Sequence, residues 1–167
     1  TEAVFTLDVT KTNQQISFAS LVDKAVGDPA FDLSATATSG LGVTFSVVSG
    51  PATLAGNTLT LTGAAGVVTI RATQAGNAAY NPAPDALRSF TVVPGGQIIT
   101  FETPSDRTYG NAAFDLSASA SSGLPVTFTV LDGPATLSGN TLTITGAGMV
   151  KLRASQAGNA NFVAAAN

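Results

Sequence analysis

The sequence contains an internal tandem duplication, which sets the size of its folding units. Residues 14–64 align without a gap on residues 97–147, and 32 of these 51 positions are identical. After a one-residue deletion the match resumes between residues 67–80 and 149–162, with 8 of 14 positions identical. The 167-residue chain therefore holds two related copies, each long enough to bury a small core.

Apolar and polar residues alternate along most of each copy. In the first copy the alternation covers residues 31–38, 43–47, 58–62 and 68–73. This period of two predicts strands with one buried and one solvent-facing side. Glycine, proline and asparagine separate the runs, as in Gly56-Asn57, which suits a tight hairpin. We expect strands at approximately 15–20, 30–37, 42–48, 52–54, 57–62, 66–73 and 86–93, which is typical of an all-β antiparallel sandwich of about seven strands.

The two copies are out of phase with the ends of the sequence. Residues 88–92, Arg-Ser-Phe-Thr-Val, close the first copy, and a similar pattern, Val4-Phe5-Thr6-Leu7, precedes it. The second copy stops shortly after Phe162, without a counterpart of residues 86–93. We therefore expect residues 1–11 to be the last strand of a preceding repeat, 14–93 to be a full repeat, and 97–167 to be a repeat without its last strand.

Several motifs of the second copy are distinctive in combination. They are Gln-Ile-Ile-Thr-Phe at 97–101, Tyr-Gly-Asn at 109–111, Phe-Asp-Leu-Ser-Ala at 114–118, Ser-Ser-Gly-Leu-Pro-Val-Thr-Phe at 121–128, and Ser-Gln-Ala-Gly-Asn-Ala-Asn-Phe at 155–162. Together they resemble the bacterial immunoglobulin-like tandem repeats of secreted and cell-surface proteins. The resemblance implies two tandem immunoglobulin-like β-sandwiches, an extracellular or cell-surface location on a bacterium, and a structural or adhesive role. It supplies no catalytic residues.

The composition excludes several classes of function. The chain has no cysteine and no histidine, which removes thiolate nucleophiles, histidine triads and the common zinc sites. We therefore expect no enzyme activity, no catalytic residue and no cofactor. Seven Lys and Arg residues and a net charge of −3 give no footprint for nucleic acid. No apolar run approaches the roughly 18 residues of a membrane helix, so we expect no membrane segment in this chain.

Four oxygen-bearing side chains are the only candidates for a metal site. Asp23 and Asp28 in the first copy correspond to Asp106 and Asn111 in the second. They could gather around one loop and bind calcium, which takes six to eight oxygen ligands. The same residue types also cap turns through their own backbone, and no dense Asp-x-Asp run accompanies them. We expect turn capping, with calcium as the weaker interpretation.

The leading functional hypothesis is a non-enzymatic structural repeat module of an extracellular stalk or fibre, whose partners are neighbouring copies joined end to end or by strand exchange. An incomplete second repeat would expose a sheet edge, which is an aggregation hazard. The N-terminal residues Val4, Phe5, Thr6, Leu7 and Val9 match the type of the missing strand. They could fill the groove of a neighbouring copy by donor-strand complementation. Cutting a longer array at arbitrary points would produce the same ends.

The alternative hypothesis is an adhesive or glycan- or protein-binding module of a surface protein. The threonine row at 58, 60 and 62, repeated at 141, 143 and 145, could contact sugars, although such a row is usually the wet face of a strand. Binding loops usually differ between copies and carry aromatic residues or arginine. The loops here are nearly duplicated and rich in Ala, Gly and Asn, so the sequence favours the structural hypothesis.

Overall fold

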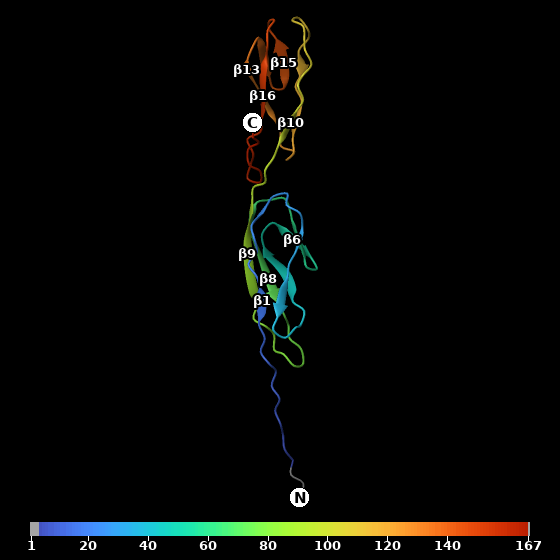
Figure 1. The fold of residues 1–167 in the computed structure, drawn as a ribbon, viewed down its shortest axis with the longest axis vertical. Helices are drawn as coiled ribbons and strands as arrows, with labels where there is room; N and C mark the ends of the chain where they lie inside the picture. Colours follow the sequence, from blue (N-terminus) through green and yellow to red (C-terminus); the bar gives the residue numbers. More distant parts are fainter. Residues whose placement is uncertain (1–3, 167) are drawn as a thin grey trace. The chain divides into compact units, whose positions relative to one another are not determined.

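The computed structural model describes residues 4–166 of the chain. The fold is all-β: these residues contain no helix, and their strands form several small sheets (Figure 1). The chain divides into two compact units, the first ending at Val93 and the second beginning at Pro94. We call them unit 1 and unit 2. The all-β class predicted from the alternation is confirmed.

Unit 1 is built from short strands that pair into three sheets. Its described strands are β1 (Ile16–Phe18), β2 (Lys24–Ala25), β3 (Phe31–Asp32), β4 (Ala35–Ala37), β5 (Thr44–Ser49), β6 (Ala52–Ala55), β7 (Thr58–Leu61), β8 (Gly66–Thr73) and β9 (Ala86–Val93). The largest sheet has the order β2-β9-β8-β5, the second β3-β7-β6, and β1 pairs with β4. A two-residue loop joins β6 to β7, and its Gly56 has a φ of 61°, as a glycine-first hairpin turn requires.

Two features of unit 1 differ from the predicted strands. The expected strand at 30–37 is divided, because Phe31–Asp32 pairs with β7 whereas Ala35–Ala37 pairs with β1 in another sheet. The short strand β2 was not expected, and it pairs parallel to β9, so the prediction of a purely antiparallel arrangement is wrong at this pair. Two residues are too few to show an alternation, and β2 is defined by its neighbour rather than by its own sequence.

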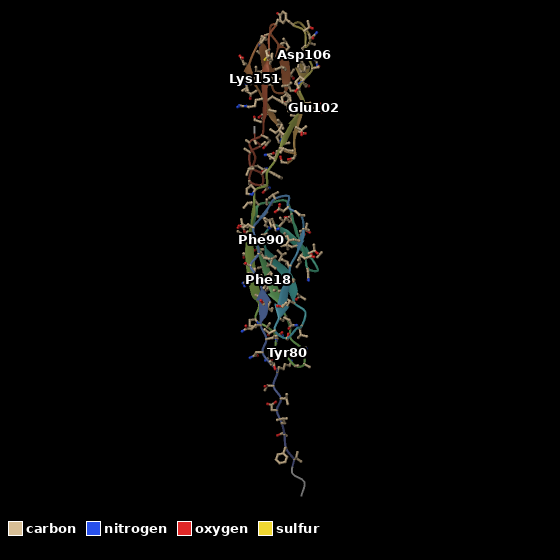
Figure 2. All side chains as sticks on the ribbon, viewed as in Figure 1. Phe18, Tyr80, Phe90, Glu102, Asp106 and Lys151 are labelled. Carbon is tan, nitrogen blue, oxygen red and sulfur yellow. The ribbon has the colours of Figure 1, made fainter. Side chains whose placement is uncertain are left out.

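The core of unit 1 forms where side chains from different sheets meet, and it includes Phe18 and Phe90, which are labelled in Figure 2. The Phe18 ring of β1 lies 5.3 Å from that of Phe45 in β5, and the Phe31 ring of β3 lies 5.9 Å from that of Phe90 in β9. Phe90 is 3% exposed and its neighbour Val92 is 1% exposed. The last strand of unit 1 is therefore an integral part of the core rather than a peripheral addition.

Unit 2 repeats most of this arrangement. Its described strands are β10 (Ile99–Phe101), β11 (Phe114–Asp115), β12 (Ala118–Ala120), β13 (Thr127–Asp132), β14 (Ala135–Ser138), β15 (Thr141–Ile144) and β16 (Lys151–Ser155). The sheets are β11-β15-β14 and the pairs β10-β12 and β13-β16, with the registers of their counterparts in unit 1. Among residues 94–166, nothing corresponds to β2 or β9.

A backbone bridge fixes the point at which each unit begins. In unit 1 the Thr12 N–H donates to the Ala79 carbonyl, and the Thr12 carbonyl accepts from the Asn81 N–H, both at 2.9 Å. Gly95 makes the equivalent bonds to residues 161 and 163 in unit 2. Residues 4–10, which precede the Thr12 bridge, form no strand and are exposed throughout (Figure 1).

Candidate strand-acceptor groove

Unit 1 shows how the last strand of a repeat is held. Strand β9 lies between β8, to which it is antiparallel, and β2, to which it is parallel. On the β8 side, Phe90 lies opposite Val68. On the β2 side, the Thr91 N–H donates to Asp23 Oδ1 at 2.7 Å, and the Val93 carbonyl accepts from the Val26 N–H at 2.9 Å. Both edges of β9 are therefore bonded.

Unit 2 has a groove where unit 1 has β9. Its volume is about 730 Å³, and its lining combines residues 103–109, which correspond to the β2 region, with Leu142, Ile144, residues 146–150 and Leu152. Strand β16, the counterpart of β8, pairs with β13 alone among the described residues. Its second edge therefore keeps free backbone donors and acceptors, which can bond an added strand.

The exposure of corresponding side chains shows which part of unit 2 is less covered than unit 1. In unit 1, Val68, Ile70 and Ala72 of β8 are 0% exposed, whereas their counterparts in β16, at positions 150, 152 and 154, are all partly exposed. By contrast, Leu59 and its counterpart Leu142, away from β16, are 0% and 2% exposed. Unit 2 thus keeps the core around Leu142 and loses cover on the face that β9 protects in unit 1.

An aromatic contact of unit 1, made by Phe90, has no counterpart among the described residues of unit 2. In unit 1 the Phe31 ring is flanked by the Phe90 ring at 5.9 Å and by Lys24 Nζ at 4.9 Å. In unit 2 the corresponding ring, Phe114, has the Arg107 guanidinium at 4.3 Å, and the described residues give it no aromatic neighbour. The groove therefore offers a position for a phenyl ring against Phe114.

The segment predicted to act as donor has the properties of an unpaired strand. Val4, Phe5, Leu7 and Val9 are 87%, 91%, 88% and 80% exposed. Aligned on β9, Phe5 matches Phe90 and Leu7 matches Val92, so both point to one side of an extended strand while Thr6 points to the other. Within residues 4–11 the structure shows no strand, and residues 1–3 of the strand expected at 1–11 lie outside the described part of the chain.

The candidate calcium ligands are mostly engaged by backbone amides. Asp23 accepts from Thr91, Asp28 Oδ2 accepts from the Ala25 N–H at 2.9 Å, and Asn111 Oδ1 accepts from the Thr108 N–H at 2.8 Å. Asp106 has no hydrogen-bond partner among the described residues. Residues 4–166 contain no group of three or more acidic, histidine or cysteine side chains placed to hold a metal. Turn and edge capping thus accounts for three of the four candidates.

In each unit, the first threonine of the row considered for adhesion makes a side-chain hydrogen bond to an aspartate. Thr58 Oγ1 donates to Asp32 Oδ1 at 2.6 Å, and Thr141 Oγ1 donates to Asp115 Oδ1 at the same distance. These bonds link neighbouring strands on the solvent-facing side. They give the first threonine of each row a cross-strand role.

Turn capping and calcium binding, the two interpretations of Asp23 and Asp106 from sequence, both missed the position of Asp23 beside the last strand of unit 1. A signal for that position is present in the sequence. Between residues 19–26 and 102–109 every position differs except this aspartate. A single retained carboxylate in a divergent segment indicates a contact that both repeats need.

Comparison with protein-family models and with curated proteins found no match. No helix among residues 4–166 is long and apolar enough to cross a membrane. The function must therefore be inferred from the groove and from its filled counterpart in unit 1.

Proposed function

We propose that the chain is a non-enzymatic structural module of a bacterial extracellular stalk or fibre, built from tandem immunoglobulin-like β-sandwiches. Three observations support this proposal. The two units are near duplicates, their strands bury aromatic and aliphatic side chains between small sheets, and the sequence contains few groups capable of chemistry. Repetition of an inert, packed unit suits a mechanical role better than a catalytic one.

Neighbouring copies join by strand addition: residues 4–9 of one copy enter the groove of unit 2 in another. The observation that carries this proposal is that unit 1 contains its own last strand at the position of the groove. In unit 1 the same groove holds β9, whose Phe90 and Val92 are buried, and the donor segment presents Phe5 and Leu7 at the matching positions. Strand addition provides backbone bonds along the edge and pockets for alternate side chains.

The distribution of exposed aromatic side chains supports assembly over adhesion. Among the described residues, only Phe5 and Tyr109 are exposed aromatic residues, at 91% and 64%. Phe5 belongs to the donor segment and Tyr109 lines the groove. Exposed aromatic residues mark interaction surfaces, and here both belong to the two surfaces that strand addition would cover.

Light scattering after size-exclusion chromatography, with electron microscopy, tests this function. The chain should form linear assemblies, and a variant lacking residues 1–10 or carrying Phe5→Ser with Leu7→Ser should remain monomeric. Val4→Ser is the matched control, because the corresponding position in β9 is Ser89, on the exposed side. Assembly that survives removal of residues 1–10 would contradict strand exchange, and a fully monomeric wild-type chain would contradict polymerisation.

A further inference from the structure

We infer that the groove of unit 2 accepts the donor segment in a single register, which Phe5 selects by packing against Phe114 and in which Asp106 anchors the strand. In that register the Thr6 N–H of the second copy donates to the Asp106 carboxylate, and Phe5 lies opposite Val150. The inference rests on the proposed strand addition and extends it, because it names the residue that anchors the incoming strand.

Asp23 performs this role in unit 1. Strand β2 is only two residues long, so it offers β9 few backbone partners. The Asp23 carboxylate extends this edge by accepting the Thr91 N–H at 2.7 Å, one residue before Val92 pairs with Lys24. A backbone N–H that loses its partner at a sheet edge costs free energy, and a carboxylate is a strong acceptor for it.

Asp106, which is labelled in Figure 2, occupies the corresponding position in unit 2, and it lines the groove. It has no hydrogen-bond partner within residues 4–166, whereas Asn111, a few residues further on, caps its own turn. Lys24, Ala25 and Val26 have all been replaced in the second copy, but the aspartate has been kept. A retained acceptor beside an open groove is consistent with a donor that arrives from outside the unit.

The apolar pattern and the Phe114 ring together leave one register. In unit 1, Val67 lies opposite Thr91 and Val68 opposite Phe90, which places Met149 opposite Thr6 and Val150 opposite Phe5. A slip of one residue would turn Phe5 out of the groove. A slip of two places the N–H of Val4 or Asp8 at Asp106 instead, but it moves the Phe5 ring about 6–7 Å along the groove, away from Phe114. Phe5 therefore selects the register, and Asp106 binds the amide that this register brings to it.

Engineered disulfides can report the register, because the chain has no cysteine of its own. Since the Thr91 N–H points to Asp23, Thr91 and Val67 face each other as a non-hydrogen-bonded pair, with Cα atoms about 4.5 Å apart. That spacing permits a disulfide. The acceptor is a Met149→Cys variant lacking residues 1–10, which all precede the bridge at Thr12. The donors are peptides of residues 2–10 with cysteine at position 6 or at position 4.

The position-6 peptide should form the disulfide and the position-4 peptide, which reports a two-residue slip, should not. Introducing Asp106→Ala into the acceptor should lower the cross-linking yield of the position-6 peptide without raising that of the position-4 peptide. Val67→Cys with Thr91→Cys inside unit 1 is the positive control for the geometry. Equal cross-linking of both peptides to the acceptor that retains Asp106 would overturn the single register.

Binding of the unmodified peptide, measured by fluorescence anisotropy, tests the role of Asp106 separately from strand addition itself. Asp106→Ala should weaken binding about tenfold, as expected for one hydrogen bond to a charged group at a partly exposed site. Methylation of the Thr6 amide nitrogen in the peptide should weaken binding to the unsubstituted acceptor by a similar factor. On the Asp106→Ala acceptor, the same methylation should change the affinity little, because the hydrogen bond is already absent. Asp106→Asn should recover part of the affinity. Asp115→Ala, on strand β11, is the control that should leave binding unchanged.

Two negative results have different meanings. If the peptide binds but Asp106→Ala leaves its affinity unchanged, the positioning role of Asp106 is wrong and strand addition stands. If the peptide does not bind to a folded acceptor, strand addition itself fails, and the inference about Asp106 fails with it.

Discussion

Truncation of Phe5 should weaken strand addition more than any other single change in the donor segment. The Phe5 side chain is 91% exposed in the free chain, and its counterpart Phe90 is 3% exposed in β9. Insertion would therefore transfer almost the whole ring from water to a position against Phe114. An aromatic side chain buries about 150 Å² or more, which corresponds to about 4 kcal/mol at about 25 cal/mol per Å².

Alanine retains part of this burial, so the expected loss for Phe5→Ala is about 3 kcal/mol, or about a 100-fold rise in Kd. The assay is titration of a labelled peptide of residues 2–10 into the acceptor that lacks residues 1–10. Val4→Ala is the matched control, because Val4 aligns with exposed Ser89 and should change Kd by less than about threefold, the scale of a surface substitution.

Two results would refute this reasoning. If Phe5→Ala and the wild-type peptide bind equally well, the ring does not enter the groove. If Val4→Ala weakens binding more than Phe5→Ala, the opposite face of the strand is the buried one, and the alignment with β9 is wrong.

Three further predictions concern the two units. Phe90→Ala should destabilise unit 1 by about 3–5 kcal/mol in denaturant unfolding, because it removes the ring from a filled core, and unchanged stability would contradict the role assigned to β9. In a Tyr80→Phe background, the donor peptide should protect Tyr109 fluorescence from acrylamide quenching, since Tyr109 is 64% exposed in the groove; unaltered quenching with bound peptide would place the peptide elsewhere. Gly50→Ala should destabilise unit 1 by more than about 1 kcal/mol, because a Cβ there would lie 2.2 Å from a β8 carbonyl oxygen at a φ of 101°. Gly42→Ala, in open space, is its control, and equal stabilities of the two variants would contradict the packing of this turn on β8.

The sequence predicted best those strands that show a clear alternation of apolar and polar residues. The expected strands at 66–73 and 86–93 coincide with β8 and β9, which are long and half-buried. Strand β2 could not be predicted, because Lys24 and Ala25 form a strand only through their parallel pairing with β9. The division of the 30–37 run also depends on tertiary structure, since its two halves join different sheets.

In the candidate site, too, some features follow from the sequence pattern and others only from tertiary contacts. The out-of-phase duplication predicted that residues 97–166 would hold no counterpart of β9, and it predicted which segment resembles that strand. It could not assign Asp23 and Asp106, which were interpreted as turn caps or calcium ligands because spacing along the chain says nothing about Thr91. Only the fold brings Asp23 to within 2.7 Å of that amide, and the role of Asp106 follows from this contact.

High-resolution electron cryomicroscopy of the assembled chain tests the central claim most directly. Strand addition predicts density for a strand between residues 106–109 and β16 of each unit 2. That strand should be residues 4–8 of a different copy, with the Phe5 ring against Phe114. Assemblies in which this groove holds no strand, or holds a strand other than residues 4–8, would contradict the account.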